Sequence, residues 1–408
     1  MGAALRWLVA KQVPFRVRSG GHSYAGYSTI GGGVVLDLRR LDHVAVAPNG
    51  ALATIGAGAQ LIDVYAALAA HGRTIPAGSC PSVGIGGHAL GGGMGLAGRA
   101  FGLTADNIVA VRLVTAEGTV KLVDERTDPQ LLWALRGGGG GNFGIATEFT
   151  LGLHSTPASA SWFSVTWPWS QAADALAAWQ AWAPHAPDEI TSIFHLETGA
   201  ESPVVSVAGQ YLGPGGALAQ LLAALTAGGG ALSLGQSSYL ALQVRWAGCL
   251  GVPLQSCHTV NTAPGGTLPR ADFAAKSDYV TVPLPAAGRE ALVSAINLKQ
   301  GQPGSGAILF DSYGGAINRV AADATAFVHR DALCCIQYLA YDGGGSWLRQ
   351  THDRMRPYVS GMAYQNYIDP DLPSWRHAYY GANYGRLVAT QRRVDPAHVF
   401  RFPQAIGT

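Results

Sequence analysis

A glycine-rich stretch from Gly78 to Asn107 constrains the fold of this chain more than any other feature. Glycine makes up a third of the stretch, which contains neither lysine nor glutamate. Because glycine has no Cβ, its backbone can adopt positive φ angles and lie directly against a flat or phosphorylated ligand. A loop of this composition loses much entropy on folding unless a ligand orders it. The stretch therefore predicts a cofactor cradle that contains two reactive groups, Cys80 and His88.

The composition of the whole chain excludes several classes of protein. Its 408 residues, 48% of them hydrophobic, suffice for two or three domains with a substantial core. The net charge is only +2 and neither sign forms a long run, which argues against a nucleic-acid partner. No apolar run has the length of a membrane span, and Leu5–Ala10 is too short for the apolar part of a secretory signal. Five cysteines are too few for a disulfide scaffold.

The first 154 residues alternate short strands, helices and glycine runs. Hydrophobic periodicity predicts the end of a helix over Ala4–Lys11 and a second helix over Gln60–His71. A third helix begins at Asp128 as its cap, with Pro129 in the first turn, and ends at Gly137. Strands are expected over Val13–Val17, Val34–Leu38, Ala51–Ile55, Ile108–Thr115, Thr119–Val123 and Ile145–Leu153, the fourth and fifth forming a hairpin.

A second glycine segment, Arg18-Ser19-Gly20-Gly21-His22-Ser23, follows the first strand. Consecutive backbone N–H groups in such a segment form a nest for a diphosphate. The spacing is not Gly-x-Gly-x-x-Gly, so a nicotinamide fingerprint is not indicated.

The composition changes after about His154, where tryptophans appear and glycine becomes less frequent. We place a domain boundary there. Strand-like runs then alternate with Ala/Leu-rich helices such as Ala217–Thr226, which predicts an antiparallel sheet with helices on one face. The strands expected in this part are Ile193–Leu196, Val204–Tyr211 and Ala307–Ser312.

Four motifs together resemble the FAD-linked oxidases of the berberine-bridge-enzyme-like group, within the vanillyl-alcohol-oxidase (PCMH-type) flavoproteins. They are RSGGHSYAGYS (18–28), AGSCPSVGIGGHALGGGMGLAGRAFGLTADNIV (77–109), WALRGGGGGNFGIATEFT (133–150) and the closing YQNYIDPDLPSW…YYGANYGRL…DPAHVFRFPQ. The resemblance covers nearly the whole chain, and the motifs occur in the family's order.

The resemblance implies an α+β fold in three parts. A two-subdomain FAD-binding domain occupies residues 1–154, an inserted substrate domain with an antiparallel sheet flanked by helices occupies 155–369, and residues 370–408 return to the FAD domain. Relative to the family, we expect the chain to start inside the first helix of the FAD domain. Any export signal would precede that point, so the compartment stays open between cytoplasmic and exported.

The resemblance also implies FAD held by two covalent bonds, from His22 to the 8α-methyl group and from Cys80 to C6. Without the family, His22 could be a loop histidine bonded to backbone and Cys80 a buried free thiol. His88 is expected beside the polar edge of the flavin, where a donor stabilises negative charge. Val83 matches a gate that admits O2 when small. Further expected FAD contacts are Arg18, Ser19, Gly20, Gly21, Ser23, Gly84, Gly87, Gly91, Asp106, Asn107, Gly141, Gly144, Ile145 and Asn383.

For catalysis the family pattern places tyrosines near the flavin, here Tyr338 beside Gln337 in the sheet, and Tyr379 and Tyr380 in the tail. An alcohol carbon gives up hydride easily only if the hydroxyl proton leaves too, so a base is needed. Of the neighbouring tail tyrosines only one can face the substrate if the segment is extended. The pattern favours Tyr379, with the opposite assignment left open. Aromatic packing with satisfied hydroxyls is the alternative for each tyrosine.

The expected function is oxidation of an alcohol, sugar or glycosylated natural product, with O2 as acceptor and H2O2 as product. Two alternatives stay open: a dehydrogenase that uses a quinone or protein acceptor, and a flavin- or ligand-binding protein without turnover. We expect no nucleic-acid or membrane partner, no metal, and a monomer or weak dimer.

The remaining cysteines carry weaker expectations. Cys249 and Cys257 are close enough to close a surface loop, and relatives often contain such a pair, so a disulfide is expected. Cys257-His258 has no second Cys/His pair at zinc spacing. Cys334 and Cys335 lie in an apolar strand and are expected to be free thiols.

Overall fold

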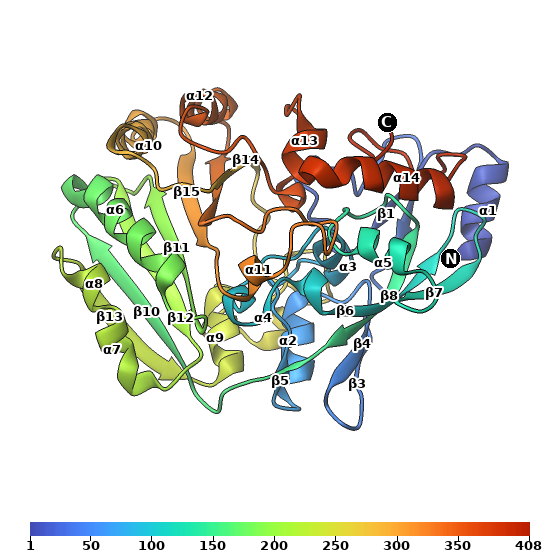
Figure 1. Ribbon diagram of the computed structural model, residues 1–408, viewed down its shortest axis with the longest axis horizontal. Coiled ribbons are helices and arrows are strands. Elements are labelled where there is room, and N and C mark those ends of the chain that lie inside the picture. Colours follow the sequence, from blue (N-terminus) through green and yellow to red (C-terminus); the bar gives the residue numbers. More distant parts are fainter.

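Two antiparallel sheets organise the computed structural model, which describes residues 1–408 (Figure 1). The smaller sheet has five strands, in the order β3 (Val44–Val46), β4 (Leu52–Gly56), β8 (Ile145–Gly152), β6 (Ile108–Val114) and β7 (Val120–Asp124). A parallel pair, β1 (Phe15–Arg18) and β2 (Val34–Asp37), lies beside it, and a short pair joins β5 (Arg73–Thr74) to β9 (His154–Ser155).

The larger sheet has seven antiparallel strands. Their order is β13 (Ala231–Ser237), β10 (Ala160–Trp167), β12 (Val204–Tyr211), β11 (Ile190–Glu197), β15 (Ser305–Ser312), β16 (Cys334–Tyr341) and β14 (Phe273–Val280). Three helices pack on its outer face, namely α6 (Ala172–Trp182), α10 (Ala286–Lys299) and α12 (Gly345–Met355). The predicted antiparallel sheet with helices on one face is therefore confirmed.

The two faces of the large sheet differ in chemistry because side chains alternate along a strand. One set of alternate residues, which includes Phe194, Ile308 and Ile336, is buried against the helices in a core of 32 residues. The opposite set faces the first part of the chain and includes Glu197, His195, Asp311 and Gln337. We call this second face the floor, because it lies under the glycine-rich segments.

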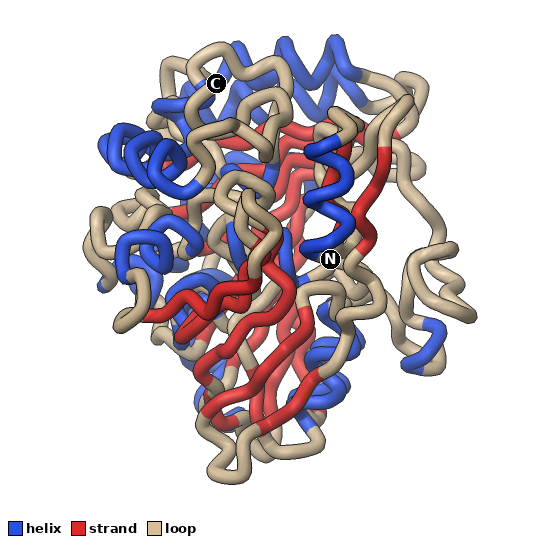
Figure 2. Tube along the Cα trace, turned by 90° about the vertical axis from the view of Figure 1, so that its right-hand side faces the viewer, coloured by secondary structure: helices blue, strands red, loops and turns tan.

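The C-terminal segment returns to the small sheet. Its helices α13 (Trp375–Tyr380) and α14 (Tyr384–Val394) lie near α5 (Pro129–Leu135) (Figure 1). Residues between Ala363 and Ile406 share one 44-residue core with residues between Leu5 and Leu151. The N-terminal helix α1 (Gly2–Ala10) lies at the right-hand edge of Figure 1 and therefore at the front of the view in Figure 2.

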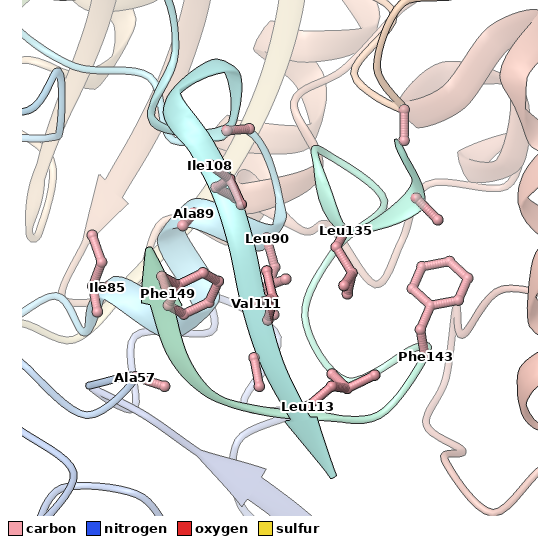
Figure 3. Close-up of a cluster of buried hydrophobic side chains, with 14 of the residues drawn as sticks. Ala57, Ile85, Ala89, Leu90, Ile108, Val111, Leu113, Leu135, Phe143 and Phe149 are labelled. Carbon is pink, nitrogen blue, oxygen red and sulfur yellow. The ribbon is translucent and has the colours of Figure 1, made fainter. Parts of the chain in front are cut away.

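The core of the small sheet fixes the glycine cradle in place. Ile85, Ala89 and Leu90 of α3 (Ile85–Leu90) are buried beside Val111 of β6 and Phe149 of β8 (Figure 3). These apolar side chains hold one face of α3 in the core. Gly87 and His88 lie on the other face of α3, outside this core.

Most predicted elements are found within one or two residues of their expected bounds, and the Asp128 side chain accepts the Leu131 N–H as predicted. The helix expected over Ala217–Thr226 is instead divided into α7 (Leu218–Leu221) and α8 (Ala223–Thr226). Leu222 stays in the right-handed helical region at φ −89° and ψ −5°, but its ψ is far from the regular α-helical value. The leucines at 218, 222 and 225 are all buried.

The remaining helices are short connections, apart from two that pack against each other. These two are α2 (Leu61–Ala69) and α9 (Tyr239–Trp246), and the short ones are α4 (Gly98–Phe101) and α11 (Ala316–Arg319). None of the helices combines the length and the apolar character needed to cross a membrane.

Candidate active site

The two glycine segments pack backbone against backbone. A Cβ on Gly20 would overlap the backbone nitrogen of Gly84, and a Cβ on Gly84 would overlap that of Gly20. Ser19 Oγ donates to Ala57 O at 2.6 Å and anchors the first segment to the small sheet. Glycine is therefore required at both positions by close approach. The contact places His22 and Cys80 on adjoining loops.

His22 and Cys80 combine solvent exposure with a desolvated setting, and we call the space beside them the hollow. Both residues are exposed to solvent. Desolvation by surrounding protein nevertheless lowers the pKa of His22 and raises the pKa of Cys80. A group that is accessible yet desolvated lies in a recess and not on an outer surface.

Glycine backbones line one wall of this hollow. A Cβ on Gly87 would meet no protein atom within 4 Å, and one on Gly140 would meet only Gly87. Packing therefore does not explain glycine at either position, whereas close approach of a ligand does. A flat ring beside His22 and Cys80, with a diphosphate on these backbones, is the shape that FAD would present. The residues of the hollow thus fit FAD.

His88 has a defined protonation state. Its Nε2 lies 3.2 Å from the backbone N–H of Gly78, which can only donate. Nε2 is therefore the acceptor, and in the neutral ring the proton is on Nδ1. Burial lowers the pKa of His88 to about 4, so the ring stays neutral. The Nδ1–H group has no protein acceptor among the observed hydrogen bonds, which suits a donor towards a bound ligand.

Several expected FAD contacts are occupied by protein. Asp106 forms a bidentate ion pair with Arg330 at 2.6 and 2.9 Å. The Asn107 amide donates to Phe101 O and Leu103 O, and the Asn383 amide donates to Ala322 O and Thr325 O. These side chains tie segments of the chain together, and their expected contacts with the cofactor stay predictions.

Five more assigned contacts have packing or hydrogen-bond partners within the protein. Ile145 is buried in the core, and a Cβ on Gly144 would clash with Leu113. A Cβ on Gly91 would overlap the side chain of Asn366, so this glycine serves contact with the tail. Arg18 pairs with Asp37 at 2.7 Å, and Ser23 Oγ accepts the Tyr27 N–H at 3.1 Å. Gly21 and Gly141 adopt φ angles of +79° and +77°, as their loops require.

The tyrosines expected to act as base do not face the hollow. Tyr379 Oη accepts the Asp369 N–H at 2.8 Å, and Tyr380 Oη donates to Gly138 O at 3.1 Å. Both lie in α13, so the assumption of an extended segment was wrong. Tyr338 points to the helix-covered face of the large sheet, where its ring lies in the core. These positions argue against each of the three hydroxyls as the base.

Gln337, the neighbour of Tyr338, points to the floor. Its Nε2 donates to Tyr24 Oη at 2.7 Å. The Tyr24 ring stacks on Tyr367 with centroids 5.3 Å apart and planes 4° from parallel. Tyr24 and Tyr367 were missed, although each lies in a quoted motif, Tyr24 two residues after His22. The hydroxyl of Tyr24 thus connects the first glycine segment to the floor.

Asp311 is the acidic group of the floor nearest to the reactive residues. It faces Cys335 on one side and Ile193 on the other. Burial raises the pKa of Asp311 to about 7, and its charge in turn contributes to the raised pKa of Cys80. A carboxyl group that titrates near neutrality in a hollow is a strong candidate for acid–base chemistry. The sequence signal was a single acid that ends the apolar strand AILFDS.

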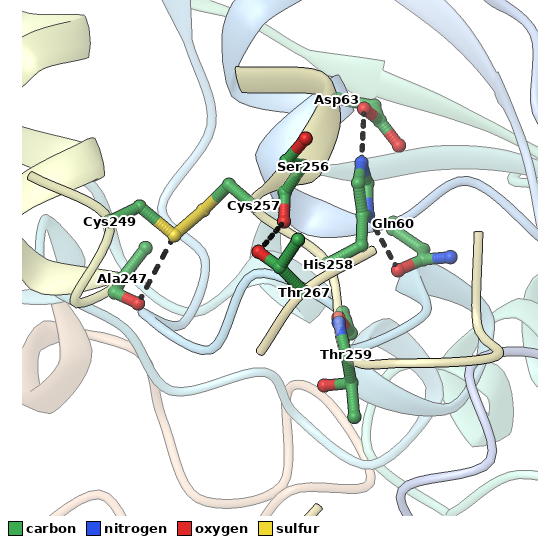
Figure 4. The surroundings of a disulfide bond; sticks show 10 residues. Gln60, Asp63, Ala247, Cys249, Ser256, Cys257, His258, Thr259 and Thr267 are labelled. Carbon is green, nitrogen blue, oxygen red and sulfur yellow. Dashed lines mark hydrogen bonds and ion pairs between the residues drawn. A yellow bond between two sulfur atoms is a disulfide. The ribbon is translucent and has the colours of Figure 1, made fainter. Parts of the chain in front are cut away.

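The predicted disulfide between Cys249 and Cys257 is present (Figure 4). The residue after Cys257, His258, lies 3.0 Å from Gln60 Oε1 and 3.3 Å from Asp63. The next residue, Thr259, donates its N–H to Ser82 Oγ at 2.6 Å. The segment that follows the disulfide is therefore hydrogen-bonded to the loop that contains Cys80.

Cys334 and Cys335 are free and buried, as predicted. No group of three His, Cys, Asp or Glu side chains is arranged to hold a metal ion.

Comparisons with known proteins agree with this geometry. Residues 1–124 match the model of an FAD binding domain, and residues 363–407 match the model described as berberine and berberine like. An uncharacterised FAD-linked oxidoreductase of Bacillus subtilis (strain 168), YgaK, is 34% identical over 99% of this chain and 88% of its own length.

Solved structures give the same result. BBE-like 1 of Physcomitrella patens is 34% identical, with a TM-score of 0.88 over 99% of this chain and 88% of that one. A variant of Phl p 4, described as a glucose oxidase, is 30% identical, with a TM-score of 0.87 over 99% of this chain and 87% of that one.

Proposed function

Since the chain belongs to the berberine-bridge-enzyme-like family of FAD-linked oxidoreductases, we propose that it oxidises a hydroxyl-bearing carbon of a sugar or related alcohol. The cofactor is FAD attached to His22 and Cys80, and O2 is the final acceptor, giving H2O2. The observation that carries this proposal is the backbone contact between Gly20 and Gly84, which places His22 and Cys80 on adjoining loops. Asp311 of the floor couples electrostatically to the Cys80 thiol. A base and the cofactor anchor thus share one hollow.

The residues of the hollow have separate tasks towards FAD. His22 and Cys80 supply the two covalent bonds, and the backbones of Ser19–Ser23 and Gly84–Gly87 supply N–H groups for the diphosphate. Neutral His88 offers its Nδ1–H where negative charge develops. When bound, the isoalloxazine supplies an acceptor for hydride.

Asp311 and Gln337 act on the substrate. The ionised carboxyl group of Asp311 accepts the proton of the reacting hydroxyl, so that a carbonyl forms as the hydride leaves. Gln337 is held by Tyr24 at 2.7 Å and presents a fixed amide to a second polar group of the substrate. The stacked pair of Tyr24 and Tyr367 offers an aromatic wall of the kind on which a sugar ring packs.

The polar floor favours a polyhydroxylated substrate over an apolar one. Glu197, His195, Asp311 and Gln337 all lie on the same face, and each offers hydrogen bonds. The solved relative described as a glucose oxidase supports the same class. Val83, which is partly buried beside the Cys80 loop, is the side chain assigned as the O2 gate, and its small size favours an oxidase.

The covalent attachment is tested with anchor variants. His22→Ala and Cys80→Ala should each retain FAD after acid precipitation, because one bond is left in each protein. The double variant should release its FAD. The measurement is flavin absorbance in the precipitate and supernatant, with peptide mass spectrometry to locate the bonds. Release of all FAD from the unmodified protein in acid would refute bicovalent attachment.

A further inference from the structure

Three titratable side chains of the floor form a line from the interior to the rim. In the pairing of β11 with β15, Ile193 lies opposite Asp311, His195 opposite Leu309 and Glu197 opposite Ala307. Residues two apart on a strand share a face. Along the strand direction, His195 therefore lies between Asp311 and Glu197. Diagonal neighbours at this spacing are within reach of long side chains.

The two ring nitrogens of His195 differ in their surroundings. Nδ1 lies 3.7 Å from Glu197 Oε1, whereas Nε2 is buried and has no hydrogen-bond partner. A buried nitrogen without a hydrogen-bond partner lowers the stability of the folded protein. Such a cost is expected where the nitrogen takes part in function. With Nδ1 directed at Glu197, Nε2 is left free as an acceptor.

Exposure increases along the same line. The His195 side chain is 20% exposed and the Glu197 side chain 40% exposed. Interaction with His195 lowers the pKa of Glu197. When the His195 ring is protonated, its charge also opposes the burial that raises the pKa of Asp311. His195 is thus electrostatically coupled to both carboxyl groups.

We propose that Asp311, His195 and Glu197 form a proton relay that carries the substrate's hydroxyl proton from the hollow to solvent. This inference rests on the proposed function, and it adds two positioning and transfer residues that lie beyond the base itself. Its advantage is that a bound substrate covers the hollow and blocks direct exchange of Asp311 with water.

The proton balance of the relay is complete. The substrate's O–H bond breaks and its proton goes to the Asp311 carboxylate, while the C–H electron pair leaves with hydride to the flavin and the O–H pair forms the carbonyl bond. Asp311 then gives its proton to His195 Nε2. The proton on Nδ1 passes to Glu197 and from there to water, which regenerates both carboxylates and leaves His195 protonated on Nε2. Exchange of that proton with water, with return of a proton to Nδ1, restores the starting tautomer of the ring.

Other groups also influence Asp311. Those that couple to it electrostatically, apart from His195, are Tyr24 and Cys80 from the first part of the chain, Tyr313 after β15, Cys334 and Cys335 from β16, and Tyr367 from the tail. None of these is a cation, so the protonated form of His195 is the one positive charge among the groups that couple to Asp311, and its removal should raise the Asp311 pKa.

The first test needs no substrate. Holoprotein with ¹³Cγ-labelled aspartate is titrated by NMR, and Asp311→Asn identifies the Asp311 signal by its loss. In His195→Gln the Asp311 midpoint should rise by at least about 0.5 pH unit. Ser206→Ala, opposite His195 on β12, is the matched control and should leave the midpoint unchanged. An unchanged midpoint in His195→Gln would overturn the relay.

The second test measures proton transfer. With D-glucose as the probe, His195→Gln should slow anaerobic flavin reduction about 10- to 100-fold and increase its solvent deuterium isotope effect. Added imidazole should restore much of the rate, which a merely structural role of His195 would not allow. Glu197→Gln should show a smaller loss, and Ser206→Ala should react at nearly the original rate.

The outcomes separate the two proposals. Equal rates and isotope effects in the original protein and in His195→Gln would overturn the relay while leaving the oxidase intact. If D-glucose reduces the flavin of neither protein, the substrate proposal fails, and the NMR titration still decides whether His195 is coupled to Asp311.

Discussion

At the scale of single residues, Asp311 combines the properties that a base requires. Burial raises its pKa to about 7, so that near neutrality the carboxyl group is partly ionised and still basic enough to take a proton. The tail tyrosines lack this combination, because their hydroxyls are held by backbone groups and burial raises their pKa values further.

Replacement of Asp311 should therefore remove most of the chemistry. We expect Asp311→Asn to lower the rate of anaerobic flavin reduction by about 10²–10⁴ and to keep FAD covalently bound. In the original protein the rate should fall as the pH drops below about 7, since the protonated carboxyl group accepts no proton. The measurement is flavin bleaching between pH 5 and 9.

Tyr379→Phe is the matched control for this prediction. It removes a hydroxyl that bonds to the Asp369 N–H, so it should cost about 1 kcal/mol of stability and leave the rate within a few-fold. A large loss in Tyr379→Phe together with a small one in Asp311→Asn would reverse the assignment.

The close approach of the glycine segments could be predicted from the sequence because it depends on short motifs, and the family resemblance adds His22 and Cys80 as predicted anchors. Gly20, His22 and Cys80 occur in short motifs whose meaning depends on neighbouring residues. The tyrosine roles could not be predicted in this way. The partner of Tyr380 Oη is Gly138, which lies 242 positions away along the chain.

At the scale of secondary-structure elements, β14 and β16 carry a buried polar network on the face opposite to the floor. Lys276 pairs with Asp369 at 2.7 Å and connects the edge strand to the tail. Asp278 is fully buried, 3.4 Å from both His352 and Arg356. Burial raises the pKa of Asp278 to about 7, although the positive charge of Arg356 lowers it in part.

This network predicts a pH-dependent stability. Because the folded pKa of Asp278 is above its unfolded value of 3.8, the folded protein holds a proton that the unfolded chain releases. The associated stability is complete below pH 3.8 and is lost as the pH rises through about 7. Relative to Asp278→Asn, the original protein should therefore lose a few kcal/mol, at about 1.4 kcal/mol per pKa unit, between pH 5 and pH 8.

The measurement is urea unfolding of both proteins at several pH values. Asp353→Asn, which alters an exposed carboxyl group on neighbouring α12, is the control and should give a constant difference. A constant difference for Asp278→Asn as well would show that Asp278 is ionised throughout this range.

The element scale also shows why Gln337 and Tyr338 could not be assigned to faces beforehand. Seven of the eight residues of β16 are buried. Because both faces of this strand are covered, its sequence CCIQYLAY is mainly apolar and does not alternate between apolar and polar residues. The face to which Gln337 points becomes clear only from the strand pairing, in which Gln337 lies opposite Leu309, two residues from Asp311 on β15. By contrast, α5 could be placed from Asp128 and Pro129, because helix caps act within one turn.

At the scale of the whole molecule, the hollow exists because three separate parts of the chain meet. The first part supplies His22 and Cys80, the large sheet supplies Asp311 and Gln337, and the tail supplies Tyr367. The resemblance to a known family indicated this arrangement before the structure, and the relatives confirm the family and the fold. Composition and periodicity indicated the parts, but not how they meet.

The central claim is that the hollow oxidises a hydroxyl group with FAD and then reduces O2. The most direct measurement is flavin absorbance after anaerobic mixing with D-glucose, followed by admission of air and determination of H2O2. The account predicts bleaching, rapid recovery in air and one H2O2 for each flavin reduced, with recovery slowed severely in Val83→Leu. Bleaching without recovery in air, but with rapid recovery on a quinone dye, would contradict the oxidase and favour a dehydrogenase. If D-glucose and simple alcohols all fail to bleach the flavin, the claim of hydroxyl oxidation is wrong.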